Sequence, residues 1–269
     1  MTLHINSLDP YQHGHSPLHQ LDPRIKLVIA LGFILTSSLT PPGAWAVYIL
    51  LMALVMSAIL FSELGFGFTL KRALILSSPF VLAVLPLPFT VAGSPIAQIP
   101  LGFATLTISQ PGVIRFVSIL LKSWISVQAA ILLASTTQFP DLLIALRALR
   151  LPPLLVSVIG LMWRYLFVMA DETLRMLRAR SARSSTSADA ALKPGGKLTW
   201  RARVTGGMAG SLFLRSIERS DRIYAAMLSR GYDGETRALP LPPIPASAWV
   251  VFAASMLTFA FLLFLGQLF

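Results

Sequence analysis

The residues of this chain best suited to a strong polar contact with another molecule are two arginines, each at the expected end of a helix. Each arginine stands between two small residues, in Ala182-Arg183-Ser184 and in Ser229-Arg230-Gly231. A guanidinium group keeps its charge, and its planar fork can engage carboxylates or carbonyls. Small neighbours would let such a helix end enter a groove. The simpler reading is that both arginines only complement a helix dipole, but two such ends in one basic region favour a docking role.

The histidines of the N-terminal segment form a second group of residues that could do chemistry. His13, His15 and His19 are spaced closely enough to hold a divalent metal through their imidazole nitrogens. The only carboxylates near them in sequence are Asp9 and Asp22. A polar segment at a membrane surface explains the same pattern. We therefore expect no bound metal, with these three histidines as the candidate ligands if one were present.

The motifs of ordinary enzymes and ion-coupled carriers are missing from the sequence. It has no GxxxxGK[ST] phosphate-binding loop, no HExxH or GxSxG motif and no cysteine. No pair of carboxylates lies in an apolar segment, where a proton- or sodium-coupled carrier would need one. We therefore expect a non-catalytic chain that holds no cofactor of its own.

The composition indicates a polytopic membrane protein. Hydrophobic residues make up 55% of the 269 residues, and the mean hydropathy of +0.72 is too high for an ordinary soluble domain. The first 20 residues are polar and predict no cleavable signal peptide. Residues 147–237 hold 16 Lys/Arg against 7 Asp/Glu. Such a region is expected on the cytoplasmic side, in preference to a role in binding anionic lipid, and we expect no nucleic acid partner.

Five apolar segments predict transmembrane helices, at residues 25–40, 44–61, 73–91, 113–136 and 246–268. Asp22 is suited to cap the first helix and Pro23 to occupy its first position, while Arg24 anchors that end in the cytoplasm. Residues 92–112 carry no charge and predict an external loop. Lys122, within the fourth span, is expected to snorkel or to pair with a partner subunit, with a place along a transport pathway as the alternative.

The basic region predicts two long helices, at about residues 154–184 and 199–230, with a linker at 185–198. The apolar run 154–170 is long enough to suggest a span, but basic residues on both sides favour a helix packed on the spans or in the interface. Spacing predicts a pair between Asp171 and Arg175. The second helix repeats apolar residues at multiples of four, which predicts one buried stripe of Trp200, Val204, Met208, Leu212, Tyr224 and Leu228.

These segments divide the chain into four parts. We expect a cytoplasmic N-terminal segment at residues 1–24, four spans within 25–136, a cytoplasmic region at 137–237 and a last span within 238–269. With an internal N-terminus, five crossings place the C-terminus outside.

Three stretches resemble the transmembrane T component of energy-coupling factor (ECF) transporters, and within that family the CbiQ group of cobalt/nickel importers. Residues 16–27 are similar to the family's opening S-x-L-H-x-L-D-P-R-x-K-L, which includes Asp22, Pro23 and Arg24. Residues 171–184 are similar to a first coupling helix that ends in Ala-Arg-Gly. Residues 218–235, ERSDRIYAAMLSRGYDGE, are similar to the second coupling helix and its tail, the most specific of the three matches.

The resemblance implies an all-α polytopic membrane protein with about five transmembrane helices and two long cytoplasmic coupling helices. In this family each coupling helix docks its end on one subunit of an ABC ATPase dimer, and the signature arginine forms the polar contact. Arg183 and Arg230 would then be the docking residues. Arg180 is an alternative to Arg183, because Ser184 replaces the family's Gly and the triplet around Arg180 offers a second register. ATP and magnesium would be bound by the ATPases alone.

The resemblance also implies a location and further partners. A separate small membrane protein, a CbiM-like S component, would bind the cargo and reorient in the bilayer when the ATPases close. The location would be the cytoplasmic (inner) membrane of a bacterium, with the N-terminus and coupling helices inside. The cargo is expected to be cobalt or nickel, with biotin or another vitamin as the alternative. The residues themselves also permit a self-sufficient secondary transporter or channel, or a scaffold that binds anionic lipid.

Overall fold

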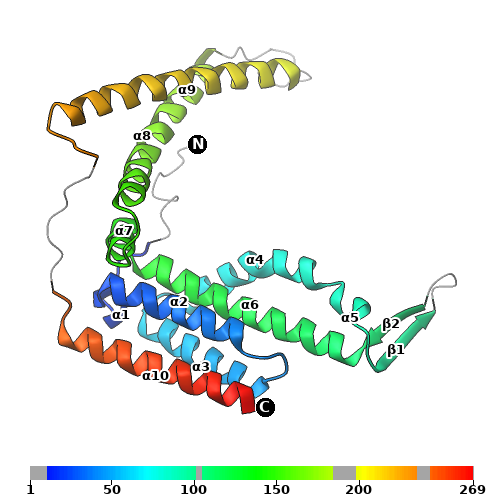
Figure 1. Ribbon diagram of the computed structural model, residues 1–269. Coiled ribbons are helices and arrows are strands. Elements are labelled where there is room, and N and C mark those ends of the chain that lie inside the picture. Colours follow the sequence, from blue (N-terminus) through cyan, green and yellow to red (C-terminus); the bar gives the residue numbers. More distant parts are fainter. Residues whose placement is uncertain (1–10, 101–104, 184–197, 235–242, 269) are drawn as a thin grey trace. The chain divides into compact units, whose positions relative to one another are not determined.

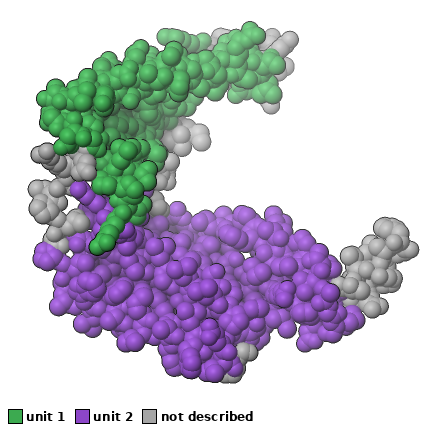
Figure 2. Space-filling model, in the orientation of Figure 1, with its two compact units in different colours: residues 1–9, 150–240 green, residues 10–149, 241–269 purple. Residues whose placement is uncertain are grey.

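The computed structural model describes residues 11–100, 105–183, 198–234 and 243–268, and the chain forms two compact units (Figure 1, Figure 2). The membrane unit comprises residues 10–149 and 241–269, and the arm unit comprises residues 1–9 and 150–240. The four-part division by sides of the membrane stays a prediction.

Helices dominate both units, and the membrane unit adds one two-stranded hairpin. The membrane unit contains α1 (Pro17–Gln20), α2 (Pro23–Leu39), α3 (Trp45–Phe61), α4 (Phe66–Val84), α5 (Leu87–Thr90), β1 (Pro95–Pro100), β2 (Thr105–Ser109), α6 (Gln110–Thr136), α7 (Phe139–Ala148) and α10 (Ala246–Leu268). The arm unit contains α8 (Pro153–Arg183) and α9 (Leu198–Leu228).

Several of these helices are suited to a membrane. Among the described residues, four stretches are long and apolar enough to cross one: Phe66–Thr90, Gln110–Thr136, Pro153–Arg183 and Ala246–Leu268. The apolar helix α3 is shorter, and α2 has 17 residues, which is about 25 Å at 1.5 Å per residue. The predicted helical, polytopic membrane fold is therefore confirmed. By length and composition alone, α8 is also a candidate membrane span. Only the basic residues that flank its apolar run argue against a span there.

The core of the membrane unit lies where α2, α3, α6 and α10 meet. Val47, Leu51 and Ile125 are fully buried there, and the rings of Phe33 and Phe259 pack edge to face at 5.8 Å. Outside this core large apolar side chains are exposed, as with Leu82 of α4 at 73%. Such surface is unfavourable in water but not against lipid or a membrane partner.

Two lysines join α2 to α6, one at each end of the pair. Lys26, in the first turn of α2, donates from Nζ to the carbonyl of Thr136, the last residue of α6, at 3.1 Å. Lys122 of α6 donates to the carbonyls of Ser38, at 3.2 Å, and Thr40 at the end of α2. Because the last carbonyls of a helix lack partners within it, each lysine caps the other's helix. Lys122 is thus engaged within the chain, and its predicted snorkelling or pairing with a partner subunit stays a prediction.

The third span begins earlier than the sequence suggested. Helix α4 starts at Phe66 and takes Lys71 and Arg72 into its first turns, where residues 73–91 were predicted. Pro79 lies inside it and cannot donate to the carbonyl of Ile75. The hydroxyl of Ser78 donates to that carbonyl at 2.8 Å. The helix therefore continues through the proline to Val84, and α5 follows as a single turn.

The segment predicted as an external loop at 92–112 contains a β-hairpin. Strands β1 and β2 are antiparallel, with Gln98 opposite Thr107 and Ile99 opposite Leu106. Helix α6 then starts at Gln110, because the hydroxyl of Ser109 accepts from the backbone N–H of Gly112 at 3.2 Å and caps it. The lack of charged residues in 92–112 is compatible with either an irregular loop or a β-hairpin, so it could not predict the strands. The hairpin satisfies its backbone groups by cross-strand pairing.

Candidate functional site

The two arginine-bearing ends belong to the long helices of the arm unit. Helices α8 and α9 have 31 residues each, roughly 46 Å at 1.5 Å per residue. None of their residues is buried within the described structure. Both helices therefore present their side chains to surroundings outside the unit.

Polar side chains join α8 to α9 where the two helices meet. The carboxylate of Glu172 on α8 accepts a hydrogen bond from the guanidinium of Arg215 on α9. The same carboxylate lies 3.6 Å from the guanidinium of Arg175 on its own helix. Arg180 donates to the hydroxyl of Thr205 at 3.0 Å. The predicted partner of Arg175 was Asp171, but Glu172 takes that place. These contacts are exposed, so each contributes modestly to stability while defining where the helices meet.

The end of α9 is a specific turn that presents Arg230. The backbone N–H of Tyr232 donates to the carbonyl of Met227 at 3.1 Å, and that of Gly231 donates to the carbonyl of Leu228 at 3.0 Å. This pair of bonds defines a Schellman motif, in which the residue after the cap adopts a left-handed conformation. Gly231 has a φ of +79° accordingly. Arg230 is the cap residue itself, and its side chain is exposed.

Arg183 and Arg180 differ in their environments at the end of α8. Arg183 is the last residue of the helix and is exposed, and it forms no hydrogen bond or ion pair with any described residue. Arg180 is half-buried and donates to Thr205 of the neighbouring helix. Ser184 lies outside the described residues. The geometry therefore leaves Arg183 more accessible to another molecule than Arg180.

The predicted buried stripe of α9 is wrong in part. Trp200, Tyr224 and Leu228 are exposed at 50%, 56% and 50%. The less exposed line of the helix runs instead through Val204, Met208, Leu212, Ser216, Arg219, Ile223 and Met227. Helix α9 meets little of the rest of the arm unit, so apolar spacing alone did not indicate which face is covered.

One face of α9 is apolar and uncovered within the arm unit. Phe213, Ile217, Tyr224 and Leu228 recur at helical spacing and are all exposed. Earlier on the same helix, no described residue lies within 4 Å of a Cβ added at Gly206, Gly207 or Gly210. The face thus passes from small residues to large apolar ones along its length.

The N-terminal motif builds a helix start rather than a reactive site. Asp22 accepts from the backbone N–H of Arg24 at 2.9 Å and caps α2, with Pro23 at the first position. The carboxylate of Asp22 also lies 3.9 Å from the guanidinium of Arg24. This motif therefore sets where α2 begins.

The histidine ring nearest this motif is occupied by hydrogen bonds. Nε2 of His19 lies 3.0 Å from the carbonyl of Gln12, and Nδ1 lies 2.6 Å from the hydroxyl of Ser16. The ring of Tyr11 stacks edge to face on His13 at 4.9 Å. Within the described part of the chain, no three His, Cys, Asp or Glu side chains gather as metal ligands. His19 is therefore engaged in holding the N-terminal segment.

The comparison with protein families settles the class of this chain. A family model described as "Cobalt transport protein", CbiQ, matches residues 14–240. The chain belongs to this family. It is accordingly a multi-pass membrane protein, the T component of ECF and cobalt transporters, and a non-catalytic subunit.

Individual relatives agree with the family assignment. A cobalt transport protein CbiQ of Rhodobacter capsulatus is 27% identical over 218 residues, 81% of each chain. An energy-coupling factor transporter transmembrane protein EcfT of Listeria innocua is 26% identical over 232 residues, 84% of each chain. A putative fused cobalt transport protein CbiMQ of Methanocorpusculum labreanum is 32% identical over 135 residues, 48% of this T component and 20% of the fused protein.

Some residues that shape the arm carry no recognisable sequence signal. Glu172, Thr205 and Arg215 define the contact between the two helices, but partners 25 and 43 residues apart are not revealed by spacing. The two arginine-bearing ends, by contrast, are recognisable from their small neighbours and from the family pattern.

Proposed function

We propose that this T component couples ATP hydrolysis to the import of cobalt or nickel. The observation that carries the proposal is the pair of exposed arginines on the arm unit, Arg183 at the end of α8 and Arg230 in the closing turn of α9. Each would dock on one subunit of an ABC ATPase dimer. ATP and magnesium are bound by those ATPases, and this chain needs no cofactor of its own.

The partners and location follow from the same proposal. The fused relative carries CbiM and CbiQ in one name, which supports a separate CbiM-like S component as the cargo-binding partner here. The apolar face of α9 offers surface for such a hydrophobic partner. The complex lies in a bacterial cytoplasmic membrane, with the N-terminus and the arm helices inside. Cobalt or nickel is preferred over a vitamin because the matching family is described as a cobalt transport protein.

The docking role is tested by reversing both charges. In the double variant Arg183→Glu and Arg230→Glu, cellular uptake of radioactive cobalt should fall at least about 30-fold, because losing a buried charged contact costs about 2–5 kcal/mol. Co-purification of the ATPases should fall with it. The matched control is Arg178→Glu with Arg203→Glu, the same charge change at exposed sites on the same helices. Normal uptake in the first double variant would exclude the proposed docking residues.

Cargo is tested separately, by the proteins that co-purify with the tagged chain. An ABC ATPase together with a small hydrophobic membrane protein that binds cobalt or nickel is the expected outcome by mass spectrometry. A biotin-binding membrane protein in its place would keep the coupling role and change the cargo. Transport by this chain alone in vesicles would instead identify a self-sufficient transporter.

A further inference from the structure

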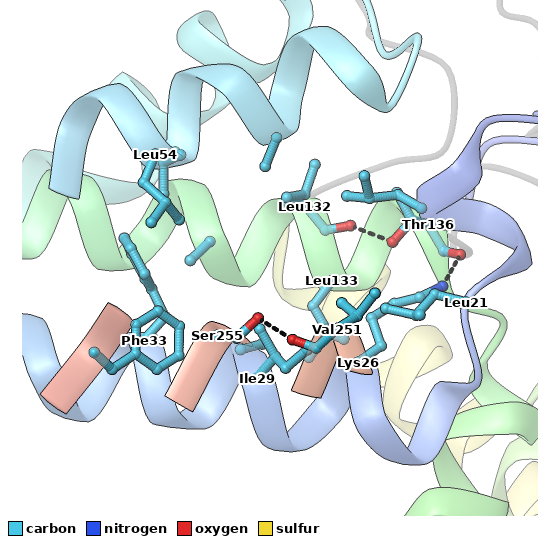
Figure 3. A pocket seen from close by; sticks show the side chains of 16 residues that line it. Leu21, Lys26, Ile29, Phe33, Leu54, Leu132, Leu133, Thr136, Val251 and Ser255 are labelled. Atoms are coloured by element: carbon cyan, nitrogen blue, oxygen red, sulfur yellow. Dashed lines mark hydrogen bonds between the residues drawn. The ribbon is translucent and has the colours of Figure 1, made fainter. Parts of the chain in front are cut away.

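The membrane unit contains an apolar pocket at the end where α2 begins. Its volume is about 240 Å³, and it is lined from α1, α2, α3, α6 and α10 (Figure 3). Most of the lining is aliphatic or aromatic, including Leu18, Ile29, Phe33, Leu54, Leu133 and Phe259. Apolar cavities of about 150 Å³ already hold benzene, so this pocket has room for several carbons of a chain.

Only one of the polar side chains that line this pocket has hydrogen-bond donors left to offer. The hydroxyl of Thr136 donates to the carbonyl of Leu132 at 2.8 Å, and that of Ser255 donates to the carbonyl of Val251 at 2.8 Å (Figure 3). Lys26 is buried, and within the described structure its Nζ donates to the carbonyl of Thr136 alone. An ammonium group has three protons. Two of them remain for an acceptor from outside the chain.

The nearby carboxylates leave the ammonium of Lys26 without a direct ion pair. Asp22 and Asp141 act on it through space. Asp22 is held by Arg24 and by its role as the cap of α2, and among the described residues neither carboxylate lies within ion-pair distance of Lys26. A buried cation in this position favours an anionic partner.

The pocket can be reached from the side of the helix bundle. Val251 lies on its rim and is 43% exposed, and it belongs to α10, a helix long and apolar enough to span a membrane. Gly32 in the middle of α2 faces Met256 and Phe259 of α10, and Gly266 near the end of α10 faces Thr40 just beyond the end of α2. The two helices therefore run in the same direction, and their starts lie at the same end of the bundle. Because Lys26 is in the first turn of α2, we expect it near the lipid headgroups, with the apolar lining beyond it.

We propose that this pocket holds one acyl chain of an anionic phospholipid, with the lipid phosphate facing the ammonium of Lys26. The acyl chain gives the apolar lining the dispersion contacts that an empty pocket lacks. The phosphate oxygens accept hydrogen bonds from the two remaining N–H groups of Lys26, and the phosphate compensates the ammonium charge. The bound lipid would bridge α2, α6 and α10 at the end of the bundle nearest the headgroups.

Photocrosslinking tests the proposal on the full chain in nanodiscs. The probes are phosphatidylglycerol and phosphatidylcholine that carry the same diazirine-bearing acyl chain. Adducts from phosphatidylglycerol should map to the pocket-lining segments of α2, α3, α6 and α10. Unlabelled phosphatidylglycerol should compete about fivefold better than phosphatidylcholine, the factor expected for one lysine near an anionic lipid. Equal competition by the two lipids, or adducts confined to other surfaces, would overturn the proposal.

Three variants separate the acyl site from the headgroup contact. Ala58→Phe adds a ring to the pocket lining while leaving the Lys26 side chain in place, and it should abolish pocket adducts from both lipids. Lys26→Gln keeps a donor for Thr136 and should retain the adducts while losing the headgroup preference. Lys122→Gln is the matched control, because Lys122 caps α2 in the same way but does not line this pocket. A preference that survives in Lys26→Gln, or pocket adducts that persist in Ala58→Phe, would contradict the assignment.

Discussion

Arg180 and Arg183 stand three residues apart on one helix but differ in what holds them. Arg180 is half-buried and donates to Thr205 of α9, whereas Arg183 is exposed at the helix end. A residue that docks on another protein should keep its side chain accessible before the complex forms. The same holds for Arg230, which a Schellman turn presents at the end of α9.

Alanine variants should distinguish the two arginines of α8. Arg183→Ala should weaken ATPase binding at least about tenfold, because it removes a charged contact at the interface. Arg180→Ala should weaken ATPase binding less than Arg183→Ala does, and Thr205→Ala, which removes the Arg180–Thr205 hydrogen bond from the other side, should have only a small effect. Affinity of the detergent-purified chain for its ATPases would be measured by titration. A larger loss of ATPase affinity in Arg180→Ala than in Arg183→Ala would identify Arg180 as the docking residue in place of Arg183.

Gly231 should be sensitive to a side chain although its surroundings are open. Its φ of +79° lies in the left-handed region, which costs an L-residue such as Ala about 1–2 kcal/mol. Among the described residues, nothing lies within 4 Å of an added Cβ. We expect Gly231→Ala to lower ATPase affinity and uptake several-fold by disturbing the turn around Arg230. Gly231→Asn is the control, since Asn tolerates this conformation. Equal losses in both variants would indicate a steric cause instead.

Helices α8 and α9 depend on each other through a few exposed polar contacts. Glu172 receives Arg215 across the helix pair and Arg175 along its own helix. Exposed pairs contribute about 0.2–1 kcal/mol each, so the crossing is held weakly, as the proposed coupling role requires. Two long helices with no buried residue are suited to transmit motion rather than to form a rigid core.

Removal of the Glu172 charge should loosen the crossing without unfolding either helix. The chain has no cysteine, so Ser181→Cys and Ala225→Cys can be spin-labelled uniquely and their separation measured by double electron–electron resonance. Glu172→Gln should broaden the distance distribution, and Arg215→Ala combined with it should add little further. Glu218→Gln, an exposed carboxylate outside these contacts, should leave the distribution unchanged. Identical distributions in all variants would show that the pair does not hold the crossing.

The membrane unit and the arm unit are stabilised by different kinds of contact. The membrane unit has an apolar core among four helices and reciprocal lysine caps between α2 and α6. Its outer surface is rich in exposed apolar side chains, which suits a bilayer. In the described part of the arm unit, α8 and α9 have no buried residue, so no core comparable to that of the membrane unit holds them together.

Loss of the Lys122 cap should destabilise the membrane unit. Lys122→Met removes the donor to the carbonyls of Ser38 and Thr40. Ser38 is exposed but Thr40 is buried, and one unsatisfied buried acceptor costs about 1–3 kcal/mol. Arg115→Met is the control, because Arg115 lies on the same helix but is exposed. Thermal unfolding in detergent, followed by circular dichroism, should show a lower midpoint for Lys122→Met alone. A similar midpoint for both variants would show that the hydrogen bonds of Lys122 do not stabilise the membrane unit.

The sequence by itself was sufficient for the features that depend on near neighbours along the chain. Hydropathy predicts the apolar helices, Asp22 and Pro23 predict the start of α2, and Gly231 predicts the end of α9, because capping and span length are local properties. The family pattern located Arg183 and Arg230, whose docking role stays a proposal.

The contacts between residues far apart in the sequence are set by the packing of the helices. Lys26 and Thr136 are 110 residues apart, Lys122 and Ser38 are 84 apart, and Arg215 and Glu172 are 43 apart. No spacing rule reaches across such separations, because helix packing and not helix propensity brings these groups together. The covered face of α9, the hairpin before α6 and the pocket beside Lys26 follow from the same packing. Local chemistry thus specifies the helices, and their packing specifies the contacts between them.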